Sequence, residues 1–67
     1  MNKLNQDLLK KYHTAIDEAA RFITKATIAI GAIHDYDYYT GGKETAAAKR
    51  ASMDLTRALA DLRRTNA

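Results

Sequence analysis

Apolar residues repeat along the first half of the chain with the period of an α-helix. One row of apolar or small residues advances in alternating steps of four and three, and a second row repeats every seven residues beside it. The first row is Leu8, Tyr12, Ala15, Ala19, Phe22, Ala26, Ala29 and Ile33, and the second is Leu9, Ile16, Ile23 and Ile30. Neighbouring rows with this spacing predict an amphipathic helix with a broad apolar face.

The second half carries a narrower version of the same pattern. Its apolar row is Ala48, Ala51, Leu55, Ala58 and Leu62, which again steps by three and four residues and is rich in alanine. A second row alternates in charge sign and consists of Arg50, Asp54, Arg57, Asp61 and Arg64. Opposite charges one turn apart support a helix and are typical of a solvent-facing side.

The residues that break helices lie near the middle of the chain. Proline is absent, and the three glycines are Gly31, Gly41 and Gly42. We therefore predict one all-α domain, residues 1–67, folded as an antiparallel helical hairpin: a helix over about 3–31, an aromatic connection over 32–42 and a helix over 43–65. An unbroken helix to residue 36 would be ~50 Å long against ~33 Å for the second, which favours a bend near Gly31. A short third helical segment near residues 32–39 is the alternative.

The segment KETAAAK, residues 43–49, resembles the start of the S-peptide helix of pancreatic-type ribonucleases. The phenylalanine and catalytic histidine that follow in that family are replaced here by other residues, and no histidine occurs after Lys49. The family also depends on disulfides, and this chain has no cysteine. We interpret the heptapeptide as the beginning of the second helix, because alanine, lysine and glutamate favour helices.

The apolar surface of the two predicted helices is unequal. The first helix offers leucines, isoleucines and a phenylalanine, whereas the second offers three leucines and small residues to cover them. A chain of 67 residues without cysteine also has little core of its own, so self-association is the remaining route to stability. We expect a homodimeric helical bundle whose interface contains Leu8, Tyr12, Ile16, Phe22, Ile23 and Ile30.

Residues that could perform chemistry do not form a recognisable set. The candidates are His13, His34, Asp35, Asp37 and the tyrosines, and no glycine-rich phosphate loop or serine-centred motif is present. The run from His34 to Asp37 could surround a divalent metal, but its spacing matches no established site. We expect a non-enzymatic protein without cofactor or metal.

Protein binding is the leading functional prediction. Tyrosine is enriched at interface hot spots, and three tyrosines with two carboxylates form a compact tip between the helices. The expected partner-binding residues are Asp35, Tyr36, Asp37, Tyr38, Tyr39 and Ile28. A role in which these rings only cap the end of the bundle is the other interpretation. Small cysteine-free binders of this kind are typical of phages and mobile elements, where they act as inhibitors or adaptors of host machinery.

Nucleic-acid binding is the alternative function. The net charge is +3, and the expected contacts on the first helix are Lys3, Lys10, Lys11, Arg21 and Lys25. The second helix is the weaker candidate, because Asp54 and Asp61 alternate with Arg50 and Arg57 and would repel phosphates.

The sequence also bears on location. The N-terminal segment is charged where a signal peptide would be apolar, and the apolar run 28–33 is too short to span a bilayer. We expect a cytoplasmic protein, either of its own cell or of an infected host cell.

Overall fold

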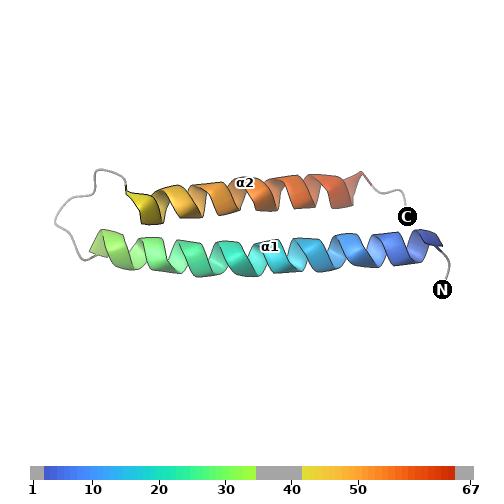
Figure 1. Ribbon diagram of the computed structural model, residues 1–67, viewed down its shortest axis with the longest axis horizontal. Coiled ribbons are helices and arrows are strands. Elements are labelled where there is room, and N and C mark those ends of the chain that lie inside the picture. The colour runs from blue at the N-terminus through green and yellow to red at the C-terminus, as the bar shows by residue number, and fades with distance from the viewer. Residues whose placement is uncertain (1–2, 35–41, 65–67) are drawn as a thin grey trace.

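Two α-helices lie antiparallel and side by side in the computed structural model, which describes residues 3–34 and 42–64 (Figure 1). Helix α1 is Lys3–His34 and helix α2 is Lys43–Arg63, and the two pack against each other. The molecule measures 54 × 16 × 13 Å. The longer α1 extends past both ends of α2 (Figure 1). The prediction of an all-α helical hairpin is confirmed.

Helix α1 does not end or break at Gly31, so the predicted boundary near residue 31 was wrong. The helix continues for one further turn to His34. A single glycine costs a helix only about 1 kcal/mol relative to alanine, and the neighbouring turns supply the backbone hydrogen bonds that carry the helix through it. The length mismatch that favoured a bend is accommodated because α1 overhangs α2. No third helix occurs within the described residues, and residues 35–39 lie outside them.

Helix α2 begins one residue after a glycine with extended backbone. The N-cap is Gly42, with φ −168° and ψ −178°, and its carbonyl oxygen accepts a hydrogen bond from the Ala46 N–H at 2.9 Å. Glu44 lies in the first turn, where a carboxylate suits the exposed amide groups. At the other end the Arg64 N–H donates to the Ala60 carbonyl at 3.1 Å, and the helix ends at Arg63, two residues earlier than predicted.

Alanines form the centre of the contact between the helices. Ala15, Ala29 and Ala51 are the buried apolar residues of the described chain, and Ala51 is only 1% exposed. Larger side chains in the same rows, such as Phe22 and Leu55, are half-buried. Small side chains allow two helices to approach closely, because interaxial distance depends on the residues at the contact. The result is a narrow seam that brings the helices together but covers little apolar surface.

Ala51 provides the sharpest test of this seam. Replacing it with leucine would add three carbons where the opposite helix leaves no room, and overpacking of this kind typically costs about 1–3 kcal/mol. We expect Ala51→Leu to lower the midpoint of chemical denaturation, followed by circular dichroism. The matched control is Ala46→Leu at an exposed position of the same helix, which should change stability little. Equal losses in the two variants would contradict the close seam.

Gly31 allows a second test, of the continuous α1. A Cβ atom built at Gly31 meets nothing within 4 Å, so alanine fits there without steric conflict. We expect Gly31→Ala to stabilise the protein by about 0.5–1 kcal/mol, because alanine has the higher helix propensity. Ala20→Gly, at an exposed position of the same helix, should destabilise it by a similar amount. A helix that ended at residue 31 would gain nothing from the alanine.

Candidate functional site

The hairpin has two chemically different long sides. Each residue of an α-helix is rotated by about 100° from the previous one, so the residues that flank the seam can be assigned to one side or the other. In an antiparallel pair the flanks of the two helices combine into continuous surfaces. One surface has no charged residue on α1, and the other collects most of the lysines and arginines.

The first surface, called here the uncharged face, contains the second apolar row of α1. From α1 it includes Leu9, Tyr12, Ile16, Ile23 and Ile30, and from α2 it includes Ala48, Ser52, Leu55, Thr56 and Leu59. Ile16 is 60% exposed and Ile23 is 63% exposed. Lys49 and Arg63, seven residues before and after Thr56, add two charges to the α2 part of this face. A row of large apolar side chains this exposed is unusual for an isolated soluble chain and is typical of an interaction site.

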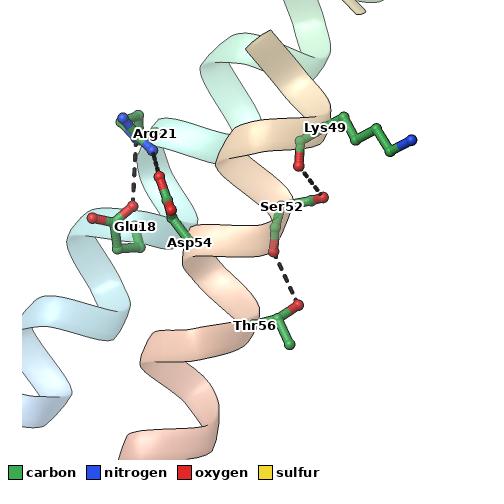
Figure 2. A network of polar contacts seen from close by, with 6 residues as sticks. All are labelled: Glu18, Arg21, Lys49, Ser52, Asp54 and Thr56. Atoms are coloured by element: carbon green, nitrogen blue, oxygen red, sulfur yellow. Dashed lines mark hydrogen bonds and ion pairs between the residues drawn. The ribbon is translucent and has the colours of Figure 1, made fainter. Parts of the chain in front are cut away.

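Hydroxyl groups on or beside the uncharged face are bonded to their own helices. Thr27 Oγ1 donates to the Ile23 carbonyl at 2.8 Å, Ser52 Oγ to the Lys49 carbonyl at 2.6 Å and Thr56 Oγ1 to the Ser52 carbonyl at 2.9 Å. Figure 2 shows the last two bonds running along α2. Burying a hydroxyl costs less free energy when it already has a hydrogen-bond partner. These groups are therefore compatible with burial of the whole face.

The opposite surface, called here the charged face, is organised by ion pairs between the helices. Arg21 lies between Glu18 of its own helix, at 3.4 Å, and Asp54 of α2, which accepts a hydrogen bond from Nη2 (Figure 2). Nearer the other end Lys11 Nζ is 3.9 Å from Asp61, which is also 3.9 Å from Arg64. These contacts draw the carboxylates of α2 towards the seam and towards α1.

A hollow opens on the charged face at the beginning of α2. Four basic residues surround it: Arg21 and Lys25 from α1, and Lys43 and Arg50 from α2. Ala46 and Ala47 line it as well, and their small side chains leave the space between the cations open. The volume is about 350 Å³. This cationic hollow was missed from the sequence, because its residues come from segments about twenty positions apart.

The predicted oligomer interface is divided by the structure between the seam and the uncharged face. Leu8 and Phe22 are half-buried in the row that faces α2. Tyr12, Ile16, Ile23 and Ile30 are exposed on the uncharged face. The second group is therefore the part of the predicted set that is accessible to another molecule.

The other predicted partner-binding residues do not join this face. Ile28 is 50% exposed, but it lies seven residues after Arg21, on the charged-face side of α1 and away from the uncharged face. The residues from Asp35 to Tyr39 lie outside the described part of the chain. His34 is the last residue of α1, and His13 is exposed in the middle of it. Among residues 3–34 and 42–64, no three potential metal ligands come together.

The predicted nucleic-acid contacts on α1 differ in their surroundings. Lys11 and Arg21 take part in the ion pairs with α2, and Arg21 and Lys25 line the cationic hollow. Lys3 and Lys10 are exposed on the charged face. The sequence argument against nucleic-acid binding by α2 was that its aspartates would repel phosphates. In the structure Asp54 pairs with Arg21 of α1 rather than with the arginines of its own helix. Within the described residues Arg50 and Arg57 form no ion pair.

Comparison with known proteins identifies no relative of this chain. No family model, curated protein or solved structure matches the chain. Neither described helix combines the length and the apolar character that crossing a bilayer would need. The functional inference therefore depends on the two faces described above.

The ion pair between Arg21 and Asp54 gives a testable contribution to stability. Both side chains remain more than a third exposed, so we expect Asp54→Asn to cost at most about 1 kcal/mol, with a smaller loss at high salt. Urea denaturation at low and high ionic strength measures both effects. Asp17→Asn is the control, because Asp17 forms no ion pair with the described residues. A loss at Asp54 that is independent of salt would contradict an electrostatic role for the pair.

Proposed function

We propose that this chain is a non-catalytic protein-binding protein that works through its uncharged face, and that a second copy of the chain covers this face. The observation that carries the proposal is the exposed row of Leu9, Tyr12, Ile16, Ile23 and Ile30 on one side of α1. Burial of such side chains contributes roughly 1.5–3 kcal/mol each, which a thin alanine seam does not supply.

The spacing of the row supports a helix as the covering element. Leu9, Ile16, Ile23 and Ile30 are seven residues apart, and Tyr12 lies between the first two. A heptad repeat of apolar residues on one helix packs into the spaces between side chains of another helix. A second copy presents the same repeat, so the two surfaces are self-complementary about a twofold axis, as most homodimers are.

The charge distribution supports a second copy over an unrelated partner. Two identical surfaces with a net charge repel each other when they meet, whereas the part of α1 on this face has no charged residue. Apart from Lys49 and Arg63, the basic residues of the described chain instead gather on the opposite side, where association would leave them in solvent. The internally bonded hydroxyls of Thr27, Ser52 and Thr56 reduce the desolvation penalty of closing the face.

The oligomeric state of the purified chain tests this proposal. We expect a mass of twice 7.5 kDa at micromolar concentration in sedimentation equilibrium. Introducing a charge with Ile23→Lys should weaken association by at least tenfold, because a lysine buried without a partner is disfavoured. The matched control is Ile28→Lys, which makes the same change on the charged-face side of the same helix and should leave the mass unchanged.

Three results would contradict the proposal. A monomeric wild-type chain at high micromolar concentration would show that a second copy does not cover the uncharged face. Dissociation by Ile28→Lys in place of Ile23→Lys would move the interface to the charged-face side of α1. Equal association of wild type and Ile23→Lys would show that the uncharged face is not buried. Circular dichroism of each variant separates loss of association from loss of helix.

A further inference from the structure

The cationic hollow brings together positive charge that the fold does not neutralise. Of its four basic residues only Arg21 is paired, with Glu18 and Asp54. Within the described residues Lys25, Lys43 and Arg50 form no ion pair. Like charges that converge from two helices destabilise a fold slightly, so their convergence calls for a negatively charged partner.

Further cations continue from the hollow along the charged face. Lys43, Arg50 and Arg57 are spaced by seven residues, which places them about 10.5 Å apart along α2. The C-cap residue Arg64 follows after another seven and is 3.9 Å from Asp61. These basic residues lie on one side of the helix, with Asp54 and Asp61 held between them and the seam by Arg21 and Lys11. The outward part of this surface is therefore an extended basic row, with its greatest density of unpaired charge at the hollow.

We infer that the charged face binds the phosphate backbone of double-stranded nucleic acid, with one phosphate group in the cationic hollow between Lys25, Lys43 and Arg50. The hollow is open and surrounded by cations, whereas sites for small molecules are usually enclosed and apolar. A long row of basic side chains suits a polymer with regularly repeated charges. The amide groups at the start of α2 lie at the same end of the face and favour an anion there.

This inference uses a different surface from the proposed self-association. The uncharged face and the charged face lie on opposite sides of the hairpin, so a dimer formed through the first leaves the second accessible. Binding through the backbone alone predicts affinity without base-sequence preference. It also predicts strong dependence on salt, because each neutralised phosphate releases counterions.

Fluorescence anisotropy with a labelled mixed-sequence DNA duplex and an RNA duplex tests the site. The wild type should bind at low salt, with log K falling against log salt at a slope of roughly −0.9 for each phosphate contacted. The double variant Lys43→Gln with Arg50→Gln should reduce that slope by about 2 and weaken binding at least tenfold. The matched control is Lys49→Gln with Arg63→Gln, which lowers the net charge by the same two units, from +3 to +1, on the same helix. The control should bind nearly as well as the wild type.

The following results would contradict the proposed phosphate-binding site. No binding to either duplex at low salt would refute it, and so would equal weakening by the control, since only net charge would then matter. Displacement of the duplex by polyglutamate at a comparable charge concentration would point to an acidic protein. Displacement by millimolar pyrophosphate at constant ionic strength would point to a small anion. Sedimentation of the same samples shows whether each variant keeps the wild-type mass. A variant that keeps this mass but binds the duplex more weakly has lost nucleic-acid binding and not self-association.

Discussion

The alanine seam is the constraint on which the rest of this structure depends. Ala15, Ala29 and Ala51 let two helices meet closely, but they bury little apolar surface, so the hairpin has almost no interior. Every larger apolar side chain of the described residues is at least partly exposed. A chain built in this way has little core of its own, and its exposed ion pairs add little, so most of its remaining apolar surface depends on whatever covers the uncharged face.

The two long sides of the hairpin follow from the angular offset between rows of residues on each helix. On α1 the row of Ile16, Ile23 and Ile30 is rotated by roughly a quarter of a turn from the seam residues Ala15 and Ala29. The lysines and arginines of α1 are rotated from the seam in the other direction. Since the helices are antiparallel, the corresponding flanks of α2 add to each surface. A narrow molecule thereby presents an apolar surface and a basic surface that do not interfere with each other.

The ion pairs between the helices also affect the charge of the outer surface. In the register that the two helices adopt, Arg21 pairs with Asp54 and Lys11 pairs with Asp61 across the seam. The same pairing directs Asp54 to α1 and shares Asp61 between Lys11 and Arg64, and Arg50 and Arg57 form no ion pair among the described residues. An interaction of modest strength therefore changes the chemical character of a whole surface.

Local periodicity was enough to predict both helices, the start of α2 and the surplus of apolar residues on α1, because these properties depend on spacing within one segment. Gly31 misled the prediction of the helix end, since a single glycine lowers helix propensity without preventing a helix. The pairing of Asp54 with Arg21 and the convergence of Lys25 with Lys43 were decided only by the tertiary structure. Both depend on the register between two helices, and a linear charge pattern cannot specify which residues meet across a seam.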